Sequence, residues 1–134
     1  MTSRPFLLDT MTVLWMCFRP EWLGKEARQI LTDPDSRLAY SIVNLWEIAI
    51  KKSKGGYREF VLPEDWERVI TEYLDGMAVV MREITPLHCR RIQDLPDHHR
   101  DPFDRMLIAQ ALEDDCVMVS KDEMLEKYGV KRVW

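Results

Sequence analysis

Paired cysteines, long apolar runs and an excess of positive charge are all missing from this sequence. The three cysteines, Cys17, Cys89 and Cys116, are odd in number and widely spaced. This spacing argues against a disulfide framework or a zinc site, and makes a reducing cytoplasm the expected compartment. No apolar run is long enough to span a membrane. The first such run, residues 6–8, stops at Asp9, which is too early for a signal peptide.

The charge balance narrows the choice of partners. A net charge of −4 argues against a protein that coats nucleic acid by bulk charge, but it allows a local basic groove. Neither an internal repeat nor a low-complexity segment is present. With 134 residues, 46% of them apolar, the chain predicts a single domain over residues 1–134 with a substantial core.

Short, fully apolar stretches alternate with segments of helical periodicity. Such alternation is typical of a parallel sheet covered on both faces. We therefore predict an α/β fold with three layers (α/β/α) around a central, mostly parallel sheet of four to five short strands. Strands are expected at residues 6–8, 38–40, 77–81, 117–119 and 130–134, and helices at 13–18, 24–31, 42–54, 63–76, 86–95, 102–112 and 123–128.

The stretch over residues 95–111 begins as a loop and is predicted to become a helix. Asp101 can cap that helix, and Pro102 then occupies the first helical position, where its missing N–H costs nothing. Asp104 falls in the first turn, where the helix dipole favours negative charge. An acid at both positions is ordinary capping when taken alone.

Three further acids give that helix a second interpretation. Asp9 ends the first predicted strand, Asp122 closely follows the fourth, and Glu47 lies about two turns into the helix after the second. In open parallel sheets, sites lie beyond the carboxyl ends of the strands, so these side chains are expected to converge with Asp104. Each has a simpler alternative: a helix cap for Asp9 or Asp122, and a solvated helix residue for Glu47.

Such convergence demands a cation or a proton. Two unit charges 4 Å apart repel by roughly 4 kcal/mol at an effective dielectric near 20. Carboxylate oxygens suit Mg²⁺ or Mn²⁺ better than zinc or copper. A divalent ion held in this way can activate water and stabilise charge on a phosphate oxygen, which is the chemistry of phosphodiester hydrolysis.

The most basic segment follows the helix that carries Glu47. Lys51, Lys52, Lys54 and Arg58 are either a solvated helix end that complements the dipole or a contact surface for an RNA backbone.

Basic and histidine residues also flank the helix at 102–112. Arg100 and Arg105 either screen the acids or hold RNA. His98 and His99 are expected to have a loop role, because neighbours in sequence rarely converge on one metal ion, with general-base work as the alternative.

Four tryptophans occur at helical spacing. They are expected in the core or at an interface rather than as platforms for base stacking: Trp15, Trp22, Trp46 and Trp66. Residues 64–74 and the first helices are predicted to form a dimer or partner surface away from the acids.

Four blocks of residues resemble one known family over nearly the whole chain, in the same order. The chain is similar to PIN-domain ribonucleases, and most similar to VapC-like toxins of type II toxin–antitoxin systems. The blocks are Leu7-Leu8-Asp9-Thr10 with Leu14-Trp15; Ser41 with Leu45-Trp46-Glu47-Ile48-Ala49-Ile50-Lys51; Leu95-Pro96 with His99-Arg100-Asp101-Pro102-Phe103-Asp104-Arg105 and Leu107-Ile108-Ala109-Gln110-Ala111; and Val119-Ser120 with Asp122 and Tyr128-Gly129-Val130.

The resemblance implies a parallel sheet between helices, Mg²⁺- or Mn²⁺-dependent cleavage of RNA, a homodimer and an antitoxin partner. Matched by position, the catalytic and metal-binding acids would be Asp9, Glu47, Asp104 and Asp122. Supporting roles near them would fall to Asp101, Thr10 and Ser120, with Asp101 also explicable as a cap alone.

Two positions depart from the family pattern. Met11 stands where the family usually has histidine, and Asn44 stands where a small residue is usual. Two other functions stay open as alternatives. One is a catalytically silent PIN scaffold that acts by protein binding. The other is a haloacid-dehalogenase-type phosphotransferase, although that family places a second aspartate at the position of Met11.

Overall fold

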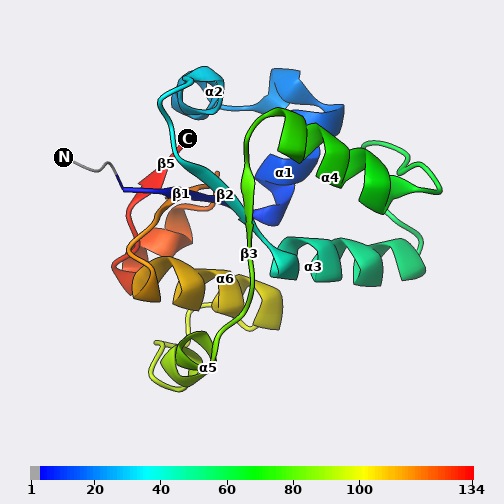
Figure 1. Cartoon of the computed structure of the whole chain (residues 1–134). Coiled ribbons are helices and arrows are strands. Elements are labelled where there is room, and N and C mark those ends of the chain that lie inside the picture. The colour runs from blue at the N-terminus through cyan, green and yellow to red at the C-terminus, as the bar shows by residue number, and fades with distance from the viewer. Residues whose placement is uncertain (1–3) are drawn as a thin grey trace.

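The centre of the molecule is a five-stranded sheet in which every strand runs parallel to its neighbours (Figure 1). The computed structural model describes residues 4–134. The strand order is β3-β2-β1-β4-β5, and Leu7 pairs with Ala39 on one side and Met118 on the other. The strands are β1 (Phe6–Leu8), β2 (Leu38–Ser41), β3 (Val80–Arg82), β4 (Val117–Val119) and β5 (Arg132–Val133).

Helices cover both faces of this sheet, which confirms the three-layer α/β/α fold. In Figure 1, α1, α2 and α4 lie on one side of the sheet and α5 and α6 on the other. The helices are α1 (Thr10–Phe18), α2 (Lys25–Thr32), α3 (Ile42–Ser53), α4 (Trp66–Gly76), α5 (Pro86–Gln93) and α6 (Pro102–Glu113), with 3₁₀ turns η1 (Pro20–Trp22) and η2 (Glu123–Tyr128).

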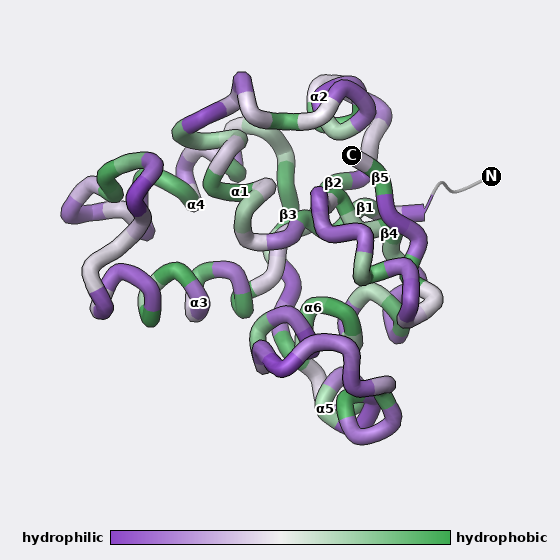
Figure 2. The backbone as a smooth tube through the Cα atoms, turned by 180° about the vertical axis from the view of Figure 1, so that it is seen from behind, coloured by the Kyte–Doolittle hydropathy of each residue, from purple (hydrophilic) through white to green (hydrophobic). Residues whose placement is uncertain are grey.

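Alternation along the strands divides the core in two. Leu8 and Val119 are fully buried against α1 and its neighbours, while Leu7 and Met118 point to the opposite face and pack with Leu107 of α6. Side chains alternate between the faces of a strand, so each of the three central strands, β2, β1 and β4, supplies both cores. Figure 2 shows the consequence: the central strands and α6 are hydrophobic, whereas the end of α3 is hydrophilic.

Polar side chains begin the helices that leave the carboxyl edge of the sheet. Asp9 caps α1, Ser41 caps α3 in a capping box with Asn44, and Asp101 caps α6 ahead of Pro102. The cap fixes where each helix starts, and therefore fixes the direction in which its first turns project from the sheet.

Several predicted boundaries are wrong in the structure. The helix expected from residue 63 begins at Trp66, and the strand expected at 77–81 lies at Val80–Arg82. The shift has a local cause: Met77 and Ala78 donate back to carbonyls of the preceding helix, and Ala78 has a φ of 58°. The chain therefore stays coiled past Gly76. The last strand is also shorter than expected.

The tryptophans are partly buried or exposed: Trp15, Trp66 and Trp134 are partly buried, whereas Trp22 and Trp46 are exposed. Trp15 packs against Trp22 and Trp134, with ring centroids 6.0 and 5.6 Å away. Trp46, by contrast, is 54% exposed on α3. All three cysteines are free, as expected. Within residues 4–134, no helix combines the length and the apolar character that a membrane span requires.

Candidate active site

Asp9 stands where β1 ends, tied to the neighbouring strand β4. Its backbone N–H donates to the Val119 carbonyl (3.2 Å), and one of its carboxylate oxygens accepts from the Thr12 N–H at 2.8 Å. The buried Ser120 hydroxyl also hydrogen-bonds to the Asp9 carboxylate, while its oxygen accepts from the Asp122 N–H at 3.1 Å. Ser120 thus joins the first and last acids of the predicted site.

Glu47 is held in place by a short chain of polar side chains. The Thr10 hydroxyl donates to a Glu47 carboxylate oxygen at 2.6 Å, and the Asn44 side-chain amide donates to the Thr10 oxygen at 3.0 Å. Asn44 is fully buried, and its own oxygen accepts from the Ser41 N–H at 2.7 Å. These hydrogen bonds link the starts of α1 and α3. They hold the Glu47 carboxylate against Thr10, the residue that directly follows Asp9.

Asp104 and Asp101 both lie at the start of α6. Asp101 accepts from the Phe103 N–H at 2.8 Å and from the Asp104 N–H at 3.4 Å, so it is the cap. Asp104 is in the first turn, half-buried, and faces the other acids closely enough to influence their protonation. Asp101 therefore combines a structural role with a negative charge near the site.

Asp122 caps η2 and is contacted by a histidine. One oxygen accepts from the Met124 N–H at 3.0 Å, and the other lies 2.7 Å from His99 Nε2. His99 is 12% exposed in its side chain, and its second ring nitrogen lies 3.0 Å from the Tyr128 hydroxyl.

The charges of these acids act on one another. Burial raises the pKa of Glu47 to about 7, and the negative charges of Asp104, Asp101 and Asp9 raise it as well. The same two causes raise the pKa of Asp104 to about 6. Burial also raises the pKa of Asp9, with a further contribution from Asp122. The structure therefore brings Asp9, Glu47, Asp104 and Asp122 together, and we call these four residues the acidic cluster.

The donor set of the acidic cluster fits a hard divalent cation. Its atoms are all carboxylate oxygens, the type that Mg²⁺ and Mn²⁺ prefer. Over residues 4–134, no group of three or more acidic, histidine or cysteine side chains is arranged to hold a metal ion by itself. Mg²⁺ keeps several of its waters and binds proteins through only one or two carboxylates, so it does not require such a cage. Repelling carboxylates draw closer when a cation lies between them.

A basic groove begins beside the acidic cluster. Its lining includes Met11, which directly follows Thr10, and the cations Lys51, Lys54 and Arg58. The charge of Glu47 contributes to a raised pKa of Tyr57, which also lines the groove, so the groove opens next to that acid. The predicted lysines therefore lie where a polyanion could approach the site.

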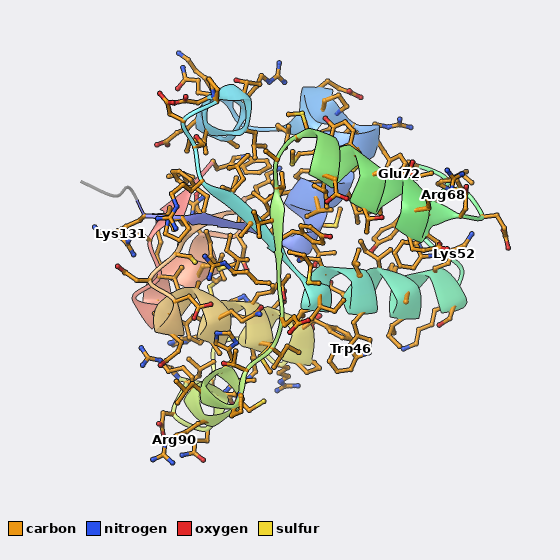
Figure 3. The ribbon with its side chains drawn as sticks, viewed as in Figure 1. Trp46, Lys52, Arg68, Glu72, Arg90 and Lys131 are labelled. Atoms are coloured by element: carbon orange, nitrogen blue, oxygen red, sulfur yellow. The ribbon has the colours of Figure 1, made fainter. Side chains whose placement is uncertain are left out.

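The other predicted RNA-binding residues have different surroundings. Lys52 points toward the segment before α4 and donates to the Leu62 carbonyl at 3.5 Å, away from the groove (Figure 3). Arg105 donates to carbonyls of the preceding loop, including Pro96 at 2.9 Å and His99 at 3.3 Å, so its guanidinium holds the loop. Arg100 is exposed beside the start of α6.

An aromatic pair lies just outside the acidic cluster. Trp46 projects from α3 (Figure 3), and its ring meets Phe103 edge-on with centroids 4.8 Å apart. These two residues directly precede Glu47 and Asp104 in the chain. The pair therefore joins α3 to α6 just outside the acidic cluster.

Three polar residues in the site were not assigned these roles from sequence. The sequence marks Asn44 as a departure from a family pattern, His99 as a loop residue with general-base work as the alternative, and Tyr128 as part of a motif. An asparagine three residues after Ser41 is the sequence signal of a capping box, and it could have placed Asn44. Nothing local connects Tyr128 with His99, because the two residues meet only through the fold.

Comparisons with known proteins agree with this geometry. Residues 6–131 match the model of the PIN domain family. The fold is similar to VapBC2 from Rickettsia felis, solved bound to a DNA fragment from their promoter, with a TM-score of 0.66, 9% identity and 96% of each chain covered. It is also similar to VapBC-1 from nontypeable Haemophilus influenzae, with a TM-score of 0.58, 18% identity and the same coverage. No curated protein sequence gives a match.

The family assignment decides between the folds considered above. The match spans β1 to the residue before β5 and includes all four members of the acidic cluster. It rules out the haloacid-dehalogenase alternative, which Met11 already disfavoured. The chain belongs to the PIN domain family.

Proposed function

We propose that this protein is a Mg²⁺- or Mn²⁺-dependent endoribonuclease and the toxin of a type II toxin–antitoxin pair. The observation that carries the proposal is the mutual influence of buried carboxylates: neighbouring acids help to raise the pKa values of Glu47 and Asp104 to about 7 and 6. An acidic cluster of this kind is costly to fold unless a cation binds it. A silent scaffold would have no use for that cost.

Each residue of the site has a defined task in this proposal. Asp9, Glu47, Asp104 and Asp122 would hold the metal ion, one or two of them directly and the others through its waters, and when bound the ion supplies water activation and stabilises charge on the phosphate. Thr10 orients Glu47 through their 2.6 Å hydrogen bond, and Ser120 orients Asp9. These fixed contacts keep the carboxylates in place while a scissile phosphate is bound.

The basic groove supports RNA as the substrate. Lys51, Lys54 and Arg58 line the groove that opens next to Glu47, and they can contact phosphates on one side of the cleaved bond. The net charge of −4 means that this attraction is local. RNA binding should therefore weaken with salt by the amount expected for a few screened phosphate contacts, and by less than for a protein that binds through its whole surface.

A second groove supports a protein partner. It lies between α1, α2 and the end of α4 and is lined by Met16, Leu23, Leu31, Tyr73 and Met77, among others. This is the surface that the sequence predicts for a partner. We assign it to an antitoxin in the cytoplasm, in keeping with the VapBC names of the similar structures.

A homodimer belongs to the same proposal. Ile42, Trp46 and Ile50 form an exposed apolar stripe at four-residue spacing on α3. We assign the second copy to this stripe on α3, whereas the sequence predicts a dimer or partner surface at residues 64–74 and the first helices. Sedimentation at micromolar concentration is expected to give a dimer. A monomer without concentration dependence would contradict the homodimer and leave the rest of the proposed function intact.

Cleavage of RNA tests the proposed function. Purified protein, freed of any partner, should cut tRNA or another structured RNA with Mg²⁺ or Mn²⁺ and stop in EDTA. Glu47→Gln should lower the rate by roughly 100-fold or more. The control is Glu67→Gln, which removes an exposed carboxylate on α4. Cleavage that persists in EDTA, or that survives Glu47→Gln, would contradict the proposal.

A further inference from the structure

A line of hydrogen bonds runs from Tyr128 through His99 to the acidic cluster. The Tyr128 oxygen lies 3.0 Å from His99 Nδ1, and His99 Nε2 lies 2.7 Å from an Asp122 oxygen. Three segments meet here: the loop before α6, the end of η2 and the cap of η2. The arrangement resembles the Asn44–Thr10–Glu47 line on the other side of the cluster.

The direction of these bonds follows from the partners. The Tyr128 oxygen already accepts from the His98 N–H at 3.1 Å. An ionised carboxylate only accepts, so His99 Nε2 must carry a hydrogen and donate it to Asp122 in either protonation state of the ring. With a neutral ring, the Tyr128 hydroxyl then donates to His99 Nδ1.

The loop that carries His99 is itself anchored. Arg105 donates to the Pro96 and His99 carbonyls, and also lies within 3.4 Å of the Ile92 oxygen. The His99 ring is tilted against the Tyr128 ring, with centroids 5.4 Å apart. Arg105 therefore holds the His99 backbone and Tyr128 holds the ring at Nδ1. With the ring fixed in this way, Nε2 can keep the Asp122 carboxylate in one position.

We infer that His99, oriented by Tyr128, is a positioning residue that fixes the Asp122 carboxylate for metal binding. The inference rests on the proposed function. Asp122 is the most exposed partner in this line, with 40% of its side chain accessible. Its oxygens accept from Met124 N–H and from His99, which leaves one lone pair on each free for a cation or its waters.

The inference predicts a loss of metal affinity when the donor is removed. Partners that orient a metal ligand are typically worth 10- to 100-fold in affinity or activity. His99→Leu should weaken Mn²⁺ binding by about 10-fold or more, measured by titration calorimetry without RNA. His99→Gln, whose amide nitrogen can replace Nε2, should restore most of that affinity. In cleavage assays, His99→Leu should raise the Mn²⁺ concentration needed for half-maximal rate while leaving the rate at saturating Mn²⁺ close to the parent's.

Two further variants keep the test independent of folding. Tyr128→Phe keeps the buried ring and removes only the hydroxyl, so it should weaken Mn²⁺ binding several-fold even if His99→Leu fails to fold. The matched control is His98→Leu, because that neighbouring side chain is exposed and meets Tyr128 only through an edge-on ring contact, with centroids 5.1 Å apart, while the backbone N–H bond to Tyr128 is kept. His98→Leu should bind Mn²⁺ like the parent.

The outcomes separate this inference from the proposed function. If the parent protein neither binds Mn²⁺ nor cuts RNA, the proposed function fails. If the parent does both, but His99→Leu and Tyr128→Phe bind Mn²⁺ equally well, the positioning role is wrong and the function stands. Equal weakening by His99→Leu and His99→Gln would also overturn the inference, because the ring's packing would then be responsible rather than its donor.

Discussion

Asp9 and Asp122 each perform two tasks with one carboxylate. Each caps a helical segment by accepting a backbone N–H, from Thr12 and Met124 respectively, and each also belongs to the acidic cluster. A capping bond uses one lone pair of one oxygen, so the rest of the carboxylate stays available. The capping and metal-binding interpretations of such residues are therefore compatible.

Asp9→Asn separates those two tasks. Asparagine caps as well as aspartate, so α1 should be unaffected, while a buried charge disappears from the cluster. We expect the metal-free protein to gain on the order of 1 kcal/mol in stability at pH 7. The stabilisation by added Mg²⁺ should shrink and RNA cleavage should collapse. Thermal melting with and without Mg²⁺, beside a cleavage assay, measures all three effects.

Asp33→Asn is the control for this change. Asp33 accepts from the Asp35 N–H at 2.9 Å on the exposed surface, outside the cluster. It should leave melting, Mg²⁺ response and cleavage unchanged. An Asp9→Asn protein that behaved in the same way would show that Asp9 is only a cap.

The raised pKa of Glu47 predicts how stability depends on pH. Between the usual value of 4.5 and about 7, the folded protein holds a proton that the unfolded chain has released. Because the folded state binds more protons in this window, the free energy of unfolding must fall as pH rises through it. With the partial exposure of Glu47 taken into account, this contribution is roughly 1 kcal/mol.

Urea denaturation in EDTA between pH 5 and pH 8 tests that sign. The parent protein should be least stable at the alkaline end of this range, and Glu47→Gln should flatten the curve and raise stability at pH 8. Glu67→Gln should follow the parent. A parent whose stability increases steadily from pH 5 to pH 8 would contradict the raised pKa.

At the scale of elements, the loop over residues 94–101 depends on one helix residue. Arg105 reaches back from α6 to the loop's carbonyls, and these contacts support His99. Arg105→Ala should therefore lower stability by roughly 1–2 kcal/mol and speed amide hydrogen exchange in the loop. The control is Arg100→Ala, an exposed residue in the same loop. Unchanged amide hydrogen exchange in Arg105→Ala would show that the loop keeps its structure without Arg105.

The elements that could be predicted from sequence are those with local signals. The start of α6 was predicted correctly because Asp101 and Pro102 specify it within two residues. The strand expected at 77–81 was misplaced because valine and methionine favour a strand, whereas the observed coil depends on the left-handed conformation of Ala78. Apolar composition alone does not encode that conformation.

The residues of the site also divide into those with a local sequence signal and those without one. The four acids could be named because each closely follows a strand or a helix start, and parallel strands end at one edge. The capping role of Asn44 has a local signal, but its bond to Thr10 and the tasks of Arg105 and Tyr128 could not be named in this way. Each depends on a partner from another segment, such as the carbonyls that Arg105 contacts or the ring that Tyr128 orients.

At the scale of the whole molecule, one close contact joins the end of the sheet to α2. A Cβ on Gly24 would lie 2.5 Å from the backbone carbonyl carbon of Trp134, so Gly24→Ala must displace that residue. We expect a loss of roughly 1–3 kcal/mol. The control is Gly76→Ala, because nothing lies within 4 Å of a Cβ there and alanine favours a helix. Thermal melting should separate the two variants, and equal melting temperatures would contradict the contact.

The central place of β1 in the sheet has a consequence for how the protein is made. β1 is the first strand to be synthesised, yet β4, the neighbour that completes the site, begins at residue 117. Pairings between such distant segments form late, and domains fold as their chains emerge. Until β4 has left the ribosome, Asp9 lacks Ser120, and Asp122, which follows β4, cannot join the acidic cluster. The acidic cluster is therefore incomplete until β4 is in place, and under the proposed function a partner could bind the emerging chain during that interval.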